Sequence, residues 1–300
     1  MSLREFLVLL LVCTIWGLHF VVMKVTISNT APPLFYAAIR MTIVMILLLP
    51  FLRLHRGQMK YVLGAGLGFG ALNYAFMFPA LKFVTASAAA VMIELYVPFS
   101  IILSIAFLGE RIGRRRILGI IIAFTGAVII ATAKPDETAG PQFLFGIGLM
   151  VCGAFSEAMG AFFVKKISGV KPIELLAWCA VVGTAVLWPL TLTLETNQFD
   201  AFTPDNRVNF ALALLYSSLL VSIVAHGSYY WLLQRLPLSV VASTGLMTTV
   251  VAVGASAALL REPMSPAFIL GGVMTLAGVT LILLRSKSKQ AVTITTEKTT

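Results

Sequence analysis

Long apolar segments recur along the chain and are separated by short polar loops. Each segment is long enough to cross about 30 Å of hydrocarbon as a helix. None shows the alternation of apolar and polar residues that is typical of barrel strands, so helices are the expected form. The ten expected spans are residues 5–25, 34–52, 61–81, 85–108, 115–133, 143–164, 173–194, 209–231, 239–260 and 266–284. Residues 286–300 are polar and without periodicity, and we expect them to form a disordered cytoplasmic tail.

The apolar pattern is repeated within the chain. Residues 80–130 align with themselves, without a gap, 152 positions further on. Matches between apolar residues carry little information. However, Glu110 also meets Glu262 at the end of a long apolar run, and Gly126 meets Gly278 in the same register. The sequence therefore predicts one membrane unit present twice.

The distribution of lysine and arginine predicts the orientation. With a cytosolic N-terminus, 16 of these residues fall in cytosolic segments and five in external ones, as the positive-inside rule requires. A unit of five helices crosses the membrane an odd number of times, so the second unit must be inverted. We therefore expect an all-α integral membrane protein with both termini in the cytosol. Its two inverted five-helix repeats are residues 1–135 and 136–285.

The composition favours the same class of protein. Apolar residues make up 59% of the chain and charged residues 11%, against about 25% charged residues in soluble proteins. The net charge of +10 comes from basic residues in short loops, so no nucleic-acid partner is expected. Cys13, Cys152 and Cys179 lie far apart in apolar segments without neighbouring histidines. We therefore expect neither a disulfide framework nor a metal site, and no cofactor.

Ionisable side chains within apolar helices are candidates for function, because they are costly to place in a bilayer. Glu94 and Glu157 are the strongest candidates. A carboxyl group there can exchange a proton during transport or pair with the ammonium group of an amino-acid-like substrate. His19 and His226 could instead bond a neighbouring helix, and Arg40 lies near enough to the outer end of its helix to reach the surface.

The depth of these residues along their helices predicts two layers. His19 and Glu94 lie in the outer third of the membrane, with Asn73 and Tyr74 at similar depth, and Glu157 and His226 lie in the inner third. Two such layers could act as gates or relay points in a carrier that opens alternately to each side.

Aromatic residues are expected to complete a cavity wall, although packed or lipid-facing rings are the alternative. Trp16, His19 and Phe20 share one helical face, as do His226, Tyr229 and Tyr230. The substrate-cavity candidates are Trp16, His19, Phe20, Asn73, Tyr74, Glu94, Tyr96, Glu157, His226 and Tyr230.

Three further residues have expected structural roles. Pro98 removes a backbone hydrogen bond and predicts a bend or hinge in the fourth span. Glu110 and Glu262 lie near the starts of the helices that follow them, where the helix dipole favours a negative charge.

Four stretches resemble a known family over nearly the whole chain. They are WGLHFVVMK at 16–24, ALKFVTASAAAV at 80–91, AFSEAMGAFFVKK at 154–166 and ASAALLREP at 255–263. With Pro32, Pro33, Arg40 and Pro98, they resemble EamA-type members of the drug/metabolite transporter superfamily. The first and third stretches are most similar to bacterial exporters of cysteine and O-acetylserine.

The resemblance implies a ten-helix inner-membrane carrier with a central cavity lined by helices 1, 3, 4, 6, 8 and 9. His19 stands where those exporters carry an amide, and Glu157 where an aromatic or small residue is common. Arg261, the repeat partner of Gly109, also departs from the pattern. These differences leave the substrate open.

We therefore expect a secondary transporter that exports an amino acid or derivative across the bacterial inner membrane by alternating access, as a monomer or homodimer and with protons as a further partner. The alternative is uptake or exchange of another small metabolite, such as a vitamin, a nucleobase-like compound or a drug. A membrane scaffold or small-molecule sensor is a third class. An enzyme is not expected, because the sequence has no nucleophile elbow, clustered metal ligands or paired acids at helical spacing.

Overall fold

The computed structural model describes residues 2–109, 112–132, 142–233, 235–236 and 243–283. This part of the chain contains helices and loops and no strand. It has nine helices that are long and apolar enough to cross a membrane, and a shorter apolar helix at the ninth expected span. The predicted all-helical, multi-span architecture is therefore confirmed. Glu110, the junction near residue 135 and the tail at 286–300 lie outside the described residues.

Besides the second span, in which η1 follows α2, three spans are built from more than one segment. The third joins α3, η2 and α4, the fourth joins α5 and α6, and the eighth joins α10, η4 and α11. The segments η2 and η4 are π-helical. The elements are α1 (Leu3–Asn29), α2 (Pro33–Leu48), η1 (Leu49–Phe51), α3 (Met59–Ala65), η2 (Gly66–Leu72), α4 (Asn73–Ala80), α5 (Ala86–Ile93), α6 (Tyr96–Leu108), α7 (Arg114–Thr132), α8 (Phe143–Val164), α9 (Pro172–Leu194), η3 (Gln198–Phe202), α10 (Arg207–Leu215), η4 (Tyr216–Ala225), α11 (His226–Leu233), α13 (Ser243–Leu260) and α14 (Pro266–Leu283).

Local sequence explains where several helices begin and end. The Ser2 hydroxyl accepts a hydrogen bond from the Glu5 N–H, and the Glu5 carboxylate accepts one from the Ser2 N–H, which makes a capping box for α1. Proline starts α2 at Pro33 and α9 at Pro172, where a missing N–H has no cost. Gly109 ends α6 with a φ of 65°, a left-handed conformation that glycine adopts without strain.

The fourth span is interrupted in the middle of the bundle. Helix α5 ends at Ile93 and α6 begins at Tyr96. Pro98 has no N–H to donate to the carbonyl oxygen of Glu94, which accepts instead from the Val97 N–H at 3.1 Å. The structure thus places the break four residues before Pro98, and the Glu94 side chain lies at the break.

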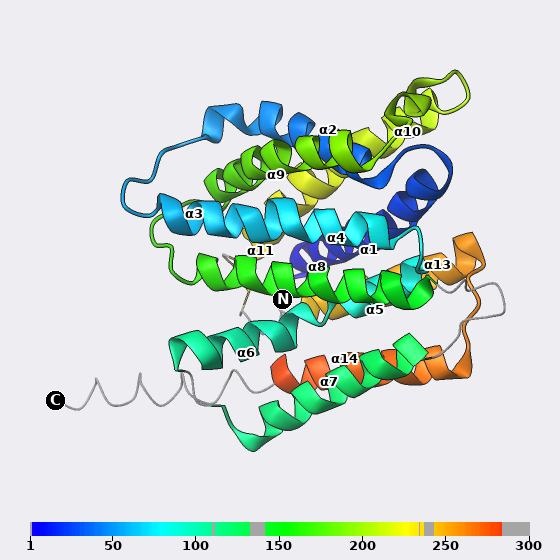
Figure 1. The fold of residues 1–300 in the computed structure, drawn as a ribbon. Helices are drawn as coiled ribbons and strands as arrows, with labels where there is room; N and C mark the ends of the chain where they lie inside the picture. Colours follow the sequence, from blue (N-terminus) through cyan, green and yellow to red (C-terminus); the bar gives the residue numbers. More distant parts are fainter. Residues whose placement is uncertain (1, 110–111, 133–141, 234, 237–242, 284–300) are drawn as a thin grey trace.

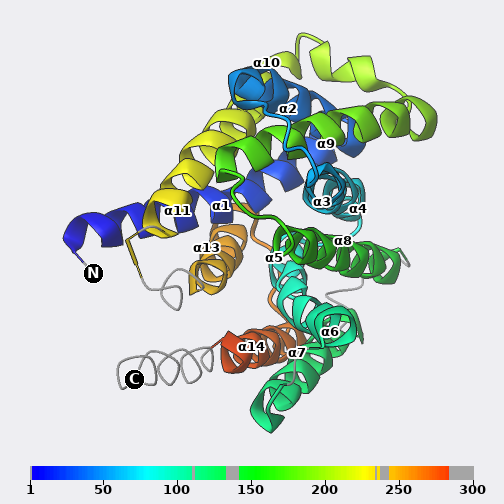
Figure 2. The same ribbon diagram turned by 90° about the vertical axis from the view of Figure 1, so that its left-hand side faces the viewer.

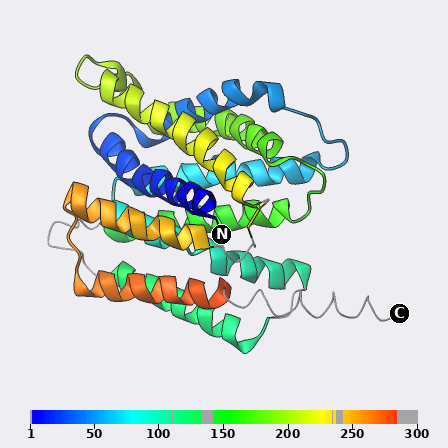
Figure 3. The same ribbon diagram turned by 180° about the vertical axis from the view of Figure 1, so that it is seen from behind.

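Equivalent helices of the two repeats pack against each other. Helix α2 packs on α9 at one edge of the bundle, and α7 packs on α14 at the other (Figures 1 and 2). Helix α1 lies beside α13 (Figure 3), and α8 packs on α5 and α6 in the corresponding way. Exchanging the two repeats maps these pairs onto one another, as a two-fold axis within the membrane plane requires.

Glycines on the α7–α14 pair show the relative direction of these two helices. A Cβ atom on Gly119 would lie 2.8 Å from the Gly278 carbonyl oxygen, and one on Gly126 would lie 2.5 Å from that of Gly271. The residue numbers of the contacting glycines increase along α7 and decrease along α14, so the two helices are antiparallel. Gly271 and Gly278 are also the repeat equivalents of Gly119 and Gly126. The two helices therefore share one glycine seam, defined by these four residues.

The glycines of the third span place it between two other helices. Gly68 packs against Gly160 of α8, and Gly70 packs against the Cys179 carbonyl oxygen of α9. Side chains at these positions would separate the helices, so the small residues permit this close packing. This packing fixes Asn73 and Tyr74, which follow directly in α4.

Candidate functional site

A cavity of about 500 Å³ lies in the centre of the bundle. Its wall includes Leu175 in the first turn of α9 and Thr244 in the first turn of α13, which begin at the end of the bundle predicted to be cytosolic. At the opposite end the buried Tyr36 ring packs on Phe78 and Phe210, with ring centroids 5.6 and 6.1 Å apart. The cavity therefore reaches toward the predicted cytosolic end and is closed at the other.

Glu94 contributes a buried carboxyl group to the cavity wall. Its side chain is only 4% exposed, and its Oε1 atom accepts a hydrogen bond from the Thr249 hydroxyl at 2.9 Å. Gly245 leaves room beside it, because a Cβ atom there would lie 3.2 Å from the same oxygen. In the described part of the chain Glu94 forms no ion pair, so its hydrogen-bonding capacity is only partly used.

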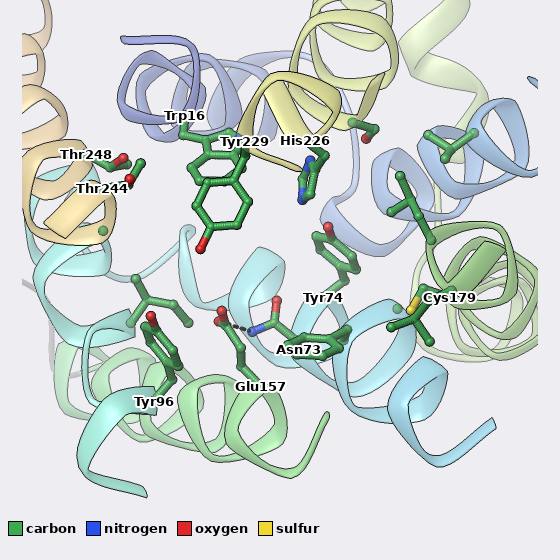
Figure 4. Close-up of a pocket in the computed structure, with 18 of the residues that line it drawn as sticks. Trp16, Asn73, Tyr74, Tyr96, Glu157, Cys179, His226, Tyr229, Thr244 and Thr248 are labelled. Carbon is green, nitrogen blue, oxygen red and sulfur yellow. Dashed lines mark hydrogen bonds between the residues drawn. The ribbon is translucent and has the colours of Figure 1, made fainter. Parts of the chain in front are cut away.

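Glu157 contributes a second carboxyl group from α8. The Asn73 side-chain amide donates to Glu157 Oε2 at 3.2 Å and to the Gly153 carbonyl oxygen at 3.1 Å (Figure 4). Asn73 therefore holds this carboxyl group against the wall between α4 and α8. No ion pair to Glu157 is found among the described residues.

Aromatic rings of Trp16, His226 and Tyr229 form the wall opposite Glu157 (Figure 4). The Trp16 ring contacts His226 and Tyr229, with centroids 5.1 and 5.2 Å away. Its indole N–H is buried and has no hydrogen-bond partner among the described residues. A ligand with an acceptor atom could satisfy this donor, since a buried N–H without a partner is costly.

The two π-helical segments occupy equivalent positions in the repeats, and further cavity residues follow directly after each of them. Asn73 and Tyr74 follow η2, and His226 follows η4. His226 Nδ1 lies 2.8 Å from the Val221 carbonyl oxygen, which can only accept, so Nδ1 carries the proton. Such segments are frequent at functional sites because they turn side chains out of the regular helical register.

The structure brings most of the predicted cavity residues together. The cavity wall contains Trp16, Asn73, Tyr74, Glu94, Tyr96, Glu157 and His226. His19 does not line it but is buried with its ring 6.3 Å from that of Tyr216, and Phe20 packs into the hydrophobic core. The Tyr230 side chain lies outside the described residues. The two expected layers meet in this one cavity, since Asn73 of the outer layer bonds Glu157 of the inner layer.

Several wall residues were not selected from the sequence. Tyr229 shares the aromatic face of His226, and that face was recognised, but Tyr230 was selected from it. Thr244 and Thr248 lie one turn apart on α13, so a polar pair at helical spacing in an apolar span was the missed signal. Ser222 gave no such signal, because its position depends on the π-helical register of η4.

Two charged residues lie in surroundings that differ from those expected. Arg40 does not reach the surface but is 1% exposed, inside the bundle. Glu262 does not cap the helix that follows it, where the Ser265 hydroxyl accepts from the Phe268 N–H at 3.1 Å. Its carboxylate instead accepts from the N–H groups of Ala86 and Ser87 at 2.6 and 3.0 Å, at the start of α5.

The described residues hold no group of three His, Cys, Asp or Glu side chains able to share a metal ion. Cys13, Cys152 and Cys179 are free thiols, and Cys179 lies on the cavity wall.

The EamA-like transporter family matches residues 3–132 and 144–284. The chain belongs to this family. It is therefore a multi-pass membrane transporter, and the family's domain occurs once in each half of the transporter.

Relatives of this EamA transporter cover nearly its full length. It is 29% identical to the "Probable amino-acid metabolite efflux pump" of Escherichia coli K12, over 98% of this chain and 99% of the relative. It is 30% identical to the protein of that name from Salmonella typhimurium LT2, over 93% and 94%. A "Probable terminal-alkyne amino-acid exporter" of Streptantibioticus cattleyicolor is 28% identical, over 69% and 67%. A crystal structure 16% identical in sequence has a TM-score of 0.60 over 95% of this chain and 98% of its own, which shows a shared fold.

Proposed function

We propose that this transporter exports an amino acid or a close derivative from the cytosol across a bacterial inner membrane. The observation that carries the proposal is the pair of carboxyl groups, Glu94 and Glu157, in an otherwise mainly apolar and aromatic cavity. The names of the relatives, amino-acid efflux pumps and an amino-acid exporter, support the same substrate class.

The chemistry of the cavity suits this substrate. A carboxylate accepts hydrogen bonds from an ammonium group, and neither carboxyl group has a cationic partner among the described residues. The rings of Trp16 and Tyr229 offer an apolar surface to a side chain. A volume of about 500 Å³ is within the range of small-molecule sites and holds an amino acid with its water. Protons are a further partner in the proposal, because a carboxyl group can bind one when the ammonium group leaves.

The test is efflux from liposomes that contain the purified protein and labelled cysteine, O-acetylserine, phenylalanine or threonine. We expect efflux of at least one of them. Glu94→Gln and Glu157→Gln should lower it about tenfold or more, since a hydrogen bond to a charged group contributes about 1.5–3 kcal/mol. Glu5→Gln is the matched control, because its exposed carboxyl group lies in the capping box of α1, far from the cavity, and glutamine serves there equally well.

A pH gradient separates the two roles of the carboxyl groups. If one of them carries a proton, the gradient changes efflux in the wild type but not in the corresponding glutamine variant. Efflux that ignores the gradient in every variant would leave a facilitator that binds only the ammonium group. Absence of efflux for all amino acids would overturn the proposal and favour a vitamin or nucleobase-like substrate stacked on Trp16.

A further inference from the structure

Arg40 is a buried cation to which neither Glu94 nor Glu157 forms an ion pair. Its side chain is 1% exposed in α2, and its Cζ atom lies 5.0 Å above the centre of the Tyr74 ring. Its Nη2 atom donates to the Ser222 hydroxyl at 3.2 Å. The Nε and Nη1 groups are buried and have no hydrogen-bond partner within the described part of the chain.

The surroundings of Arg40 supply no negative charge. The titratable groups that interact with it are His19 of α1, Tyr36 of α2, Tyr74 of α4 and His226 of α11. No described carboxylate forms an ion pair with it. An arginine is always protonated, so this site holds a full positive charge in a membrane interior with only neutral partners. Burying an unpaired charge is costly, which indicates that an anion joins Arg40 at some stage of the transport cycle.

Only one layer of side chains separates Arg40 from the cavity. Tyr74, whose ring covers the guanidinium group, and Ser222, which accepts its hydrogen bond, both line the cavity wall. In Figure 4 the Tyr74 hydroxyl points toward His226 at this part of the wall. A rotation of the Tyr74 ring would therefore open the guanidinium group to the cavity.

The same helical turn also positions a carboxyl group. Asn73 holds the Glu157 carboxyl group, and the next residue, Tyr74, covers Arg40. The cavity thus has a carboxyl group and a covered positive site, which are positioned by two consecutive residues. An amino acid carries the complementary pair of charges, an ammonium group and a carboxylate.

We propose that Arg40 binds the carboxylate of the transported amino acid once the Tyr74 ring has moved off the guanidinium group, while the acidic side of the cavity holds the ammonium group. This inference rests on the proposed function and adds the residue that recognises the carboxylate. Arginine suits the role because its planar fork can donate two parallel hydrogen bonds to a carboxylate.

The test compares an amino acid with its carboxamide, which keeps the size and the ammonium group but lacks the negative charge. Phenylalanine and phenylalaninamide are one such pair, and the amino acid that the wild type moves best sets the choice. The measured quantity is the ratio of their kcat/KM values in liposomes. We expect the wild type to prefer the amino acid by at least about tenfold, as loss of a charged partner in a buried pair predicts.

Arg40→Gln should lower this ratio to about one by impairing transport of the amino acid and not of the amide. A structural role for Arg40 would reduce transport of both substrates by the same factor and would overturn the inference. Arg40→Lys keeps the charge and should restore part of the preference. Thr125→Val is the control, because Thr125 is exposed on α7 and its hydroxyl donates to the Ile121 carbonyl oxygen of the same helix. None of the described residues that line the cavity lies on α7.

Tyr74→Leu tests the inference without changing Arg40, in case the Arg40 variants do not fold. Removing the ring that covers the guanidinium group should lower KM for the amino acid relative to KM for the amide, which has no carboxylate to bind Arg40. An unchanged ratio would contradict the inference. A wild type that moves amino acids and amides equally well would refute only the role of Arg40, whereas a wild type that moves no amino acid would refute the proposed function as well.

Discussion

The glycine seam and the cavity wall both contain residues that are repeat partners of one another. The partners are identical on the seam and different on the wall. On the seam, Gly119 and Gly126 have the identical residues Gly271 and Gly278 as repeat partners. On the wall the partners differ, with Tyr74 matched to His226 and Glu94 matched to Leu246.

The difference follows from what each region must contact. Helices α7 and α14 cross at a two-fold axis, so each glycine faces the repeat partner of its neighbour, and a side chain on either would separate both helices. The cavity must instead contact a small molecule that has no two-fold symmetry. A wall with identical residues in both repeats could not distinguish one end of the substrate from the other.

The largest expected effect comes from placing a side chain on the glycine seam. Gly126→Val would put Cβ 2.5 Å from the Gly271 carbonyl oxygen and the Thr275 N–H, both of which are backbone atoms that cannot move aside. We expect loss of most folded protein, measured as the monodisperse fraction in detergent and the apparent Tm. Overpacking of this kind costs about 1–3 kcal/mol or more.

Gly148→Val is the matched control for the seam. A Cβ atom on Gly148, which also lies in a membrane-spanning helix, would meet nothing within 4 Å. This variant should keep the Tm of the wild type. A Gly126→Val protein as stable as Gly148→Val would show that α7 and α14 do not pack through their glycines.

A second prediction concerns the closed end of the cavity. The Glu262 carboxylate of the second repeat accepts three hydrogen bonds from the start of α5 in the first, including one from the Ser87 hydroxyl at 2.6 Å. Glu262→Gln replaces an acceptor oxygen by an N–H₂ donor and removes the charge. We expect the closed end to open more often, by about tenfold, because bonds to a charged group contribute about 1.5–3 kcal/mol.

Alkylation of Cys179 measures this opening, since its thiol lies on the cavity wall. A membrane-impermeant reagent added outside cells should label Cys179 faster in Glu262→Gln than in the wild type. Ser265→Ala is the control, because the Ser265 hydroxyl caps α14 at the same end by a bond within the second repeat. Equal labelling of Glu262→Gln and the wild type would mean that this contact does not keep the cavity closed.

The sequence was most informative about the spans and the repeat. Long apolar runs set the helix ends to within a few residues, since the bilayer thickness dictates their length. The break in the fourth span followed from Pro98, whose missing N–H acts locally on the Glu94 carbonyl group. Such features depend on neighbours along the chain, so they can be predicted without knowing the packing.

The rotation of each helix about its own axis, which decides the side chains that face the cavity, could not be predicted in this way. His19 and Trp16 lie one turn apart on α1, yet only Trp16 lines the cavity. The π-helical segments shift the register of the third and eighth spans, and no residue pattern in the sequence predicted these segments. Arg40 was assigned to the surface because its distance from the helix end permitted it, whereas packing of α2 against the π-helical eighth span keeps it inside.

The smallest expected effect comes from adding a methyl group at Gly245, beside Glu94. Gly245 and Gly254 both lie on α13, but only Gly245 faces the carboxyl group. In Gly245→Ala the new Cβ would lie 3.2 Å from Glu94 Oε1, so the carboxyl group must shift by a few tenths of an ångström and its bond from Thr249 loosens. We expect kcat/KM for amino-acid efflux to fall about threefold, which corresponds to about 0.6 kcal/mol, with an unchanged Tm.

Gly254→Ala is the control for this variant, because a Cβ atom at Gly254 would have nothing within 4 Å, and it should match the wild type. An equal loss of kcat/KM in both variants would show that efflux depends on the packing of α13 and not on the position of the Glu94 carboxyl group.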